Sequence, residues 1–183
     1  MRFETDYRLE NYILNTHWED LPEAVQNRMK GCTVDLFGAL LVGSRSKQFD
    51  AGLKLANSLF GKGEIPVVGA PNKLCFAGAS TAMGHSSNAY DIDDGHNLTR
   101  THPGTSFVGA VLAAAYEKNV SRNEFFATML VAYETTVRMG AALMDYYQYA
   151  HSSGTFGAVG VVAGAGRIYG FDEKQMNNAL SSP

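Results

Sequence analysis

Cysteine, long apolar runs and clustered positive charge are all scarce in this sequence of 183 residues. Its two cysteines, Cys32 and Cys75, lie far apart and form no CxxC pair, so we expect reduced, buried thiols and a cytoplasmic location. The longest apolar run, residues 156–166, is too short to span a bilayer. The charged N-terminal stretch has no apolar core of the signal-peptide kind, so we expect neither a secretory leader nor a membrane partner.

Several chemical motifs are missing as well. The net charge is −3, and no basic run or basic-aromatic patch occurs, so nucleic acid is not an expected partner. No Walker loop and no HExxH pair is present, which argues against nucleotide binding and a zinc protease site. An EF-hand loop starting at Asp91 would have His96 and His102 where glycine and glutamate are required. A DDxxD motif at Asp93 would have Asn97 in place of its last acid. A metal site of carboxylates and imidazoles stays open as an alternative.

What the chain does contain is a repeating helical pattern. Apolar residues make up 45% of the sequence and recur at intervals of three and four, which predicts amphipathic helices around a sizeable core. We expect Pro22 at a first helical position and Gly43 as a helix C-cap. Residues 61–72 are expected to form a minor strand or an extended loop. The predicted helices cover residues 7–15, 22–43, 49–60, 73–90, 105–118, 121–146, 154–169 and 172–182.

Two capping boxes mark helix starts near the C-terminus. Ser121 with Glu124, and Asp172 with Gln175, have the spacing at which a side-chain oxygen accepts the backbone N–H of the third helical residue. Between these boxes, Gly160 and Gly164 share one helix face and allow a close helix contact. The fold class that follows is all-α, a multi-helix bundle of closely packed Gly/Ala-rich helices that forms a single domain over residues 1–183.

One stretch, residues 84–104, concentrates groups that can exchange protons. It contains three aspartates and three histidines, namely Asp91, Asp93, Asp94, His85, His96 and His102. Carboxylates and imidazoles titrate on either side of neutrality. If the stretch is helical, Asp91 and Asp94 share a face, and crowding favours retention of one proton, which suits general acid–base catalysis. The alternative is a solvated cluster of capping aspartates.

The end of this stretch and a later segment could both bind anions. His102 precedes Pro103, so we expect its ring on a loop that leads into a helix whose N-terminus attracts anions. Arg100 could hold a carboxylate with two hydrogen bonds, or be an ordinary surface charge. His85 is expected to be packed or capping, and His96 to have no role. Downstream, His151 follows three tyrosines and precedes Ser153-Gly154-Thr155, which opens another predicted helix and adds hydroxyl groups.

The motifs Asp91-Ile92-Asp93-Asp94 and His102-Pro103-Gly104, with the later segment at residues 149–157, resemble the signature of the MmgE/PrpD family. That family includes 2-methylcitrate dehydratase, cis-aconitate decarboxylase and iminodisuccinate epimerase. The resemblance covers nearly the whole chain and implies the N-terminal part of a longer, two-domain architecture. It also implies a homodimer that works without a metal or another cofactor.

By resemblance, the chain is expected to be a lyase, a dehydratase or decarboxylase, that acts on a small di- or tricarboxylic acid by proton transfer α to a carboxylate. An epimerase acting at the same site and a non-catalytic helical protein are the alternatives. Asn88, Gly95 and a slightly longer loop depart from the family pattern and leave the substrate open. The expected catalytic residues are Asp91, His102 and His151, and the expected substrate-binding residues are Asp93, Asp94, Arg100, Ser153 and Thr155.

Overall fold

The computed structural model describes residues 4–146 and 153–181, and these residues form an all-α fold, as predicted. A two-stranded hairpin is the only sheet among them. The elements are α1 (Glu4–Asn15), the 3-10 helix η1 (Trp18–Asp20), α2 (Glu23–Gly43), α3 (Lys47–Leu59), β1 (Lys62–Pro66), β2 (Lys73–Leu74), α4 (Phe76–Ser87), α5 (Pro103–Lys118), α6 (Arg122–Tyr146), the 3-10 helix η2 (Ser153–Thr155), α7 (Gly157–Ile168) and α8 (Glu173–Ser181).

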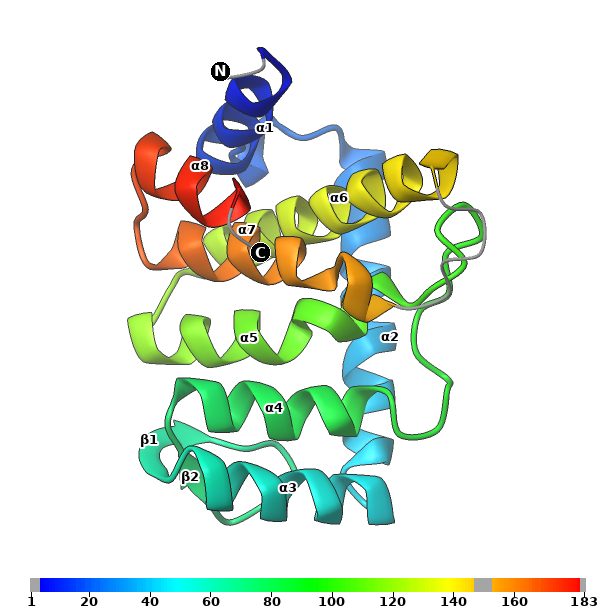
Figure 1. The fold of residues 1–183 in the computed structure, drawn as a ribbon, viewed down its shortest axis with the longest axis vertical. Coiled ribbons are helices and arrows are strands. Elements are labelled where there is room, and N and C mark those ends of the chain that lie inside the picture. Colours follow the sequence, from blue (N-terminus) through cyan, green and yellow to red (C-terminus); the bar gives the residue numbers. More distant parts are fainter. Residues whose placement is uncertain (1–3, 147–152, 182–183) are drawn as a thin grey trace.

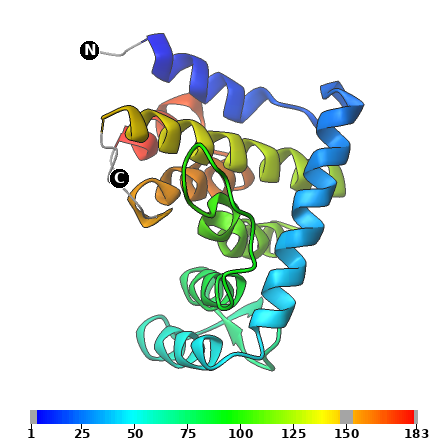
Figure 2. The same cartoon turned by 90° about the vertical axis from the view of Figure 1, so that its right-hand side faces the viewer.

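The helices α3, α4, α5 and α7 lie side by side in one stack, with α6 beyond α7 and α2 crossing their ends (Figures 1 and 2). The main core forms where α2, α5 and α6 meet, and its fully buried side chains include Leu36, Phe107 and Met129. A second cluster lies between α3, α4 and the hairpin around Phe49 and Leu74. None of the helices in the described part of the chain is long and apolar enough to cross a membrane.

Small residues allow the close packing that the sequence predicts. A Cβ atom on Gly160 would lie 1.9 Å from the Thr136 hydroxyl oxygen of α6, so α7 can approach α6 only because this position is glycine. Gly43 has the same function between α2 and α4, because a Cβ there would lie 1.8 Å from the Ser86 carbonyl oxygen. The prediction of Gly43 as a C-cap was wrong: it is the last helical residue, and Ser44 follows it in right-handed conformation.

Most helix boundaries differ from the sequence prediction by one to three residues, and two of the differences have a clear structural reason. Pro22 is the flanking residue of α2 and not its first helical residue. Lys73 and Leu74 pair with β1 as an antiparallel strand, so the helix predicted from residue 73 begins only at Phe76. The local Ala- and Gly-rich composition gave no sign of this pairing, because the partner strand lies about ten residues earlier in sequence.

The two predicted capping boxes have different outcomes. Asp172 and Gln175 form the complete box, with both reciprocal bonds present, at 2.7 and 2.9 Å. Ser121 accepts the Glu124 backbone N–H at 3.1 Å, but the Glu124 carboxylate instead binds the guanidinium of Arg167 at 2.8 Å. This box is therefore half formed, because an ion pair between α6 and α7 takes the glutamate that would have closed it.

Candidate active site

Between its two helical ends, the acidic stretch is a loop of residues 88–102 that leaves the end of α4, reaches across to α6 and returns to the start of α5 (Figure 2). It is not helical, because Asp91 has a φ of 54° in the left-handed region and ends the turn that follows Asn88. Asp91 and Asp94 therefore do not share a helix face. At the far end of the loop, His102 leads into α5 as predicted and is its N-cap, whereas the helix begins at Pro103, two residues before the predicted start.

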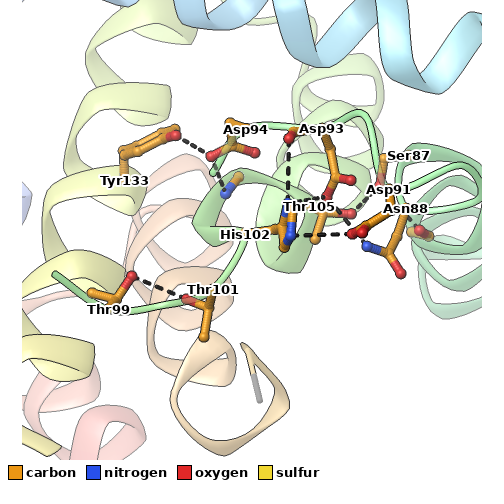
Figure 3. Close-up of polar contacts among 12 residues, drawn as sticks. Ser87, Asn88, Asp91, Asp93, Asp94, Thr99, Thr101, His102, Thr105 and Tyr133 are labelled. Atoms are coloured by element: carbon orange, nitrogen blue, oxygen red, sulfur yellow. Dashed lines mark hydrogen bonds and ion pairs between the residues drawn. The ribbon is translucent and has the colours of Figure 1, made fainter. Parts of the chain in front are cut away.

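The His102 ring lies between two carboxylates (Figure 3). Its Nε2 atom is 3.2 Å from Asp91 Oδ1. Its Nδ1 atom is 3.2 Å from the backbone carbonyl oxygen of Asp93 and 3.4 Å from Asp93 Oδ2. The loop thus brings together three of the predicted site residues, Asp91, Asp93 and His102, around one imidazole.

The partners of this imidazole determine where its protons lie. A backbone carbonyl only accepts hydrogen bonds, so Nδ1 must carry a proton to bond with the oxygen of Asp93. The remaining nitrogen, Nε2, then faces the Asp91 carboxyl group, and one proton between these two atoms completes the contact. The proton can be on the ring, giving an ion pair, or on the carboxyl group. Asp91 and His102 therefore form a pair with room for one proton between Nε2 and Oδ1.

Solvent exposure differs sharply between the two sides of the ring. The Asp91 side chain is 82% exposed, that of His102 is 30% exposed, and that of Asp93 is fully buried. Asn88 donates an amide hydrogen to Asp93 Oδ2 at 3.3 Å. Asp93 and Asn88 therefore support the inner side of the ring, while the Asp91–Nε2 side is accessible to a small molecule.

Asp94 lies apart from this pair. Its Oδ2 atom accepts the backbone N–H of Gly104 at 2.9 Å and the hydroxyl hydrogen of Tyr133 on α6 (Figure 3). Burial raises the pKa of the Asp94 carboxyl group, although both hydrogen bonds act in the opposite direction. Burial, followed by the charge of Asp94, also raises the pKa of the Tyr133 hydroxyl, so the tyrosine remains the donor.

The carboxylates and the imidazole are close enough to consider a metal ion. One ligand atom each from Asp91, Asp93 and His102 can be chosen so that all three lie within 4.8 Å of one another. However, the two carboxylates face different nitrogens of the ring, and an imidazole binds an ion through only one of them. A shared ion would therefore require one carboxylate to leave its partner. The observed pairing suits proton transfer better than metal coordination.

A groove next to the histidine could accommodate a ligand. It runs between α4, α5 and α7 as two adjoining cavities of about 500 and 470 Å³. Asn88 and Thr105 line both cavities, and Asn88 also binds Asp93, so Asn88 connects the groove to the carboxylates around the imidazole, although His102 itself does not line it. Its walls carry hydroxyl and amide groups, including those of Gln48, Ser80, Thr81 and Ser106.

The other predicted site residues occupy different places. Arg100 lies in a tight turn between His96 and Thr101, has a φ of 51°, and is exposed.

The downstream segment begins with a short helix that was not predicted. Ser153 begins this 3-10 helix, η2, which comes before α7, and Thr155 is exposed in it. His151 and the side chain of Ser153 lie outside the described residues. Gly154, three positions after His151, lines the groove together with Asn88 and Thr105.

Sequence reasoning missed two supporting residues. Asn88 was noted only as a departure from a family pattern, and its bond to Asp93 depends on the turn at the end of α4. Tyr133 lies in the middle of α6, 39 positions from Asp94, so no local spacing could have paired them. A polar ring in an otherwise apolar stretch of helix was the only available signal.

Comparison with known proteins assigns the chain to a family. A comparison with curated proteins found no significant match. The model of the MmgE/PrpD N-terminal domain matches residues 7–182, which is nearly the full length and includes both motifs that carried the resemblance. The protein therefore belongs to the MmgE/PrpD family, and its described helices are those of the family's N-terminal domain.

Proposed function

We propose that this chain carries the proton-transfer groups of a lyase that acts on a small di- or tricarboxylic acid, such as 2-methylcitrate or cis-aconitate. The observation that carries the proposal is the 3.2 Å contact between His102 Nε2 and Asp91 Oδ1. General acid–base catalysis needs a group that can accept and return a proton within hydrogen-bond reach of the substrate. An exposed pair that can take up one proton between Nε2 and Oδ1 and return it meets this need.

In the proposed reaction, the pair removes a proton α to a carboxylate of the substrate. With no proton yet on either of these two atoms, His102 Nε2 accepts the substrate proton, and the Asp91 carboxylate stabilises the resulting imidazolium. Asp93 and Asn88 hold the ring from the inner side, so the accepting nitrogen stays directed outward. Loss of water from the resulting carbanion would complete a dehydration, and reprotonation from the other face would give epimerisation. A decarboxylation would instead lose carbon dioxide and receive a proton from the pair at the carbon that carried the carboxylate, so all three reactions need proton transfer by the same groups.

Substrate binding is assigned to the groove beside the pair. Its hydroxyl and amide groups suit a polar acid with several carboxylates. We propose that Arg100, Ser153 and Thr155 bind substrate carboxylates and that His151 is a second proton-transfer group. Gly154, which lies between Ser153 and Thr155, lines the groove and supports the assignment of these two residues.

We further propose that the protein is a cytoplasmic homodimer. The two cysteines are free thiols and are only half-buried, not buried as the sequence predicts; free thiols are compatible with a reducing compartment. Several large apolar side chains are exposed on α2 and α3 and could be covered by a second subunit, namely Val34, Leu41, Leu55 and Leu59. Light scattering of the purified chain would give the oligomeric state, and a monomer at micromolar concentration would contradict the dimer.

The test of the function follows the α-proton directly. The purified chain is incubated in D₂O with citrate-like acids, and NMR measures deuterium incorporation at the α-carbon. His102→Ala is expected to slow exchange by about a hundredfold to ten-thousandfold. His17→Ala, which removes an exposed histidine between α1 and η1, is the matched control and should leave the rate unchanged.

The outcomes separate the candidate functions. Exchange that requires His102 supports the proposal, and analysis of the products identifies dehydration, decarboxylation or epimerisation. If no exchange occurs with any acid in the set, the alternative of a non-catalytic helical protein is favoured and the lyase proposal fails.

A further inference from the structure

Two neighbouring residues, Asp93 and Asp94, hold His102 from different directions. Asp93 contacts the ring itself through its backbone carbonyl oxygen and its carboxylate. Asp94 binds the backbone N–H of Gly104, two residues after His102 in the first turn of α5. The peptide at residues 93–94 is therefore attached to both the ring and the helix that carries it.

The Asp94 contact replaces an ordinary helix cap. The first N–H groups of a helix have no partner inside the helix, and the N-cap side chain usually binds one of them. His102 is the N-cap of α5 but makes no such bond with its side chain. Asp94, ten positions earlier, supplies the acceptor instead. The imidazole is not needed as a cap and can therefore face Asp91.

The same oxygen atom also links α5 to α6. Asp94 Oδ2 accepts hydrogen bonds from both Gly104 and Tyr133, so one atom joins the loop, the start of α5 and the middle of α6. The room for this arrangement is small. A Cβ atom on Gly104 would lie 2.7 Å from Asp94 Oδ1 and 2.6 Å from Leu36. Only glycine at position 104 lets the carboxylate approach so closely.

The burial and the hydrogen bonds of Asp94 determine whether it can bind a substrate. The residue is 9% exposed, and its engaged oxygen already has two donors. The N-terminus of α5, which could have attracted a substrate carboxylate, already has this negatively charged group bound to it. We infer that Asp94 is a positioning residue and not a substrate ligand: it fixes His102 against Asp91 by holding the start of α5 to α6 through Tyr133. This inference builds on the proposed proton-transfer role of His102.

The test compares Asp94→Ala with Asp94→Asn in the 183-residue chain. An amide oxygen can accept both hydrogen bonds that Oδ2 accepts, whereas alanine accepts neither. We expect the ring resonances of His102 in NMR spectra to move in Asp94→Ala and to remain near their wild-type positions in Asp94→Asn. The resonances of His17 are the internal control, and Asp35→Ala on the exposed face of α2 is the matched control variant.

Kinetics distinguish positioning from binding. For α-proton exchange, Asp94→Ala should lower kcat by about a hundredfold with little change in KM, because a misplacement of the reacting group has an effect of this size. Asp94→Asn should restore most of kcat. A large increase in KM with unchanged kcat would show a substrate ligand and overturn the inference, as would unchanged His102 resonances in Asp94→Ala.

A second variant covers the case in which Asp94→Ala does not fold. Tyr133→Phe removes one hydroxyl and leaves the carboxylate bound to Gly104, so it should move the His102 resonances in the same direction by a smaller amount. No movement in this variant would overturn the inference. The NMR readout needs no substrate, so absence of catalysis would defeat the proposed function while the His102 resonances still decide the role of Asp94.

Discussion

Asp91 combines a left-handed backbone with an exposed carboxylate at the site. Its φ of 54° lies in a region that costs most L-residues about 1–2 kcal/mol. Aspartate and asparagine tolerate this conformation better than other side chains, because their short polar groups can bond locally. The position therefore requires a residue type that is suited to the turn and that also carries an acidic group.

Substitutions at position 91 should separate these two requirements. We expect Asp91→Asn to leave the free energy of unfolding nearly unchanged, and Asp91→Ala to lower it by about 1 kcal/mol, because alanine does not favour a positive φ. Urea denaturation of the three proteins would measure the difference. Equal stability of the asparagine and alanine variants would contradict a left-handed conformation at this position.

Asp94 should give the protein an unusual dependence of stability on pH. Burial raises the pKa of its carboxyl group above the ordinary value of 3.8, so folded protein keeps this proton to higher pH than unfolded chain does. The stability contributed by this group is then full at low pH and is lost as pH rises through the raised pKa. Hydrogen bonds from Tyr133 and Gly104 and the charge of His102 reduce the shift, and the charge of Asp93 adds to it.

The measurement compares wild type with Asp94→Asn, which carries no titrating group at this position. The unfolding free energy of the wild type, relative to that of the variant, should decrease as pH rises from about 3 toward neutrality. A relative stability that increases over the same interval would mean that the pKa of Asp94 is lowered in the folded state.

At the scale of helices, glycines decide how closely the elements approach. Gly43 and Gly38 both lie in α2, but only Gly43 faces another backbone, and a Cβ atom added there would lie 1.8 Å from the carbonyl oxygen of Ser86. A Cβ on Gly38 would meet no atom within 4 Å. The two positions therefore provide a matched pair within one helix.

We expect Gly43→Ala to destabilise the fold by about 1–3 kcal/mol, because α2 and α4 must separate to admit the methyl group. Gly38→Ala should stabilise it by about 0.5–1 kcal/mol, because alanine favours the helix. Thermal or urea unfolding measures both changes. The same sign for both substitutions would show that α2 and α4 do not make the contact described.

Prediction from sequence was most successful for features that neighbouring residues determine. The helical period, the cap at Asp172 and the histidine before Pro103 are all set within a few positions, and all three are found. The residues that support the site were not predicted in the same way. The bond from Tyr133 to Asp94 and the half-formed box at Glu124 depend on contacts between distant segments.

Across the whole molecule, Arg167 on α7 connects the N-terminal helix α1 to α6. Its guanidinium binds the Glu124 carboxylate at 2.8 Å and the backbone carbonyl oxygens of Ile13 and Thr16 at the end of α1. The side chain is only 5% exposed, so these partners replace the water that would otherwise solvate its charge. This one residue on α7 therefore holds α1 against α6.

Substitution of Arg167 should destabilise the fold. We expect Arg167→Met to lower the free energy of unfolding by about 3 kcal/mol, because Glu124 and two carbonyl oxygens lose their shared partner. Hydrogen exchange should accelerate first in α1. Arg138→Met, an exposed arginine paired with Glu134 on α6, is the control and should change stability by less than about 1 kcal/mol. If both substitutions had equal effects, Arg167 would not be the connection between these helices.

The most direct test of the site is a double-mutant cycle on the rate of α-proton exchange. It compares wild type, Asp91→Asn, His102→Ala and the double variant with one carboxylic acid substrate. Groups that share one proton act as a unit, so the double variant should be no slower than His102→Ala alone. If the two losses multiplied, or if Asp91→Asn had no effect on the rate, Asp91 and His102 would not be a proton-transfer pair.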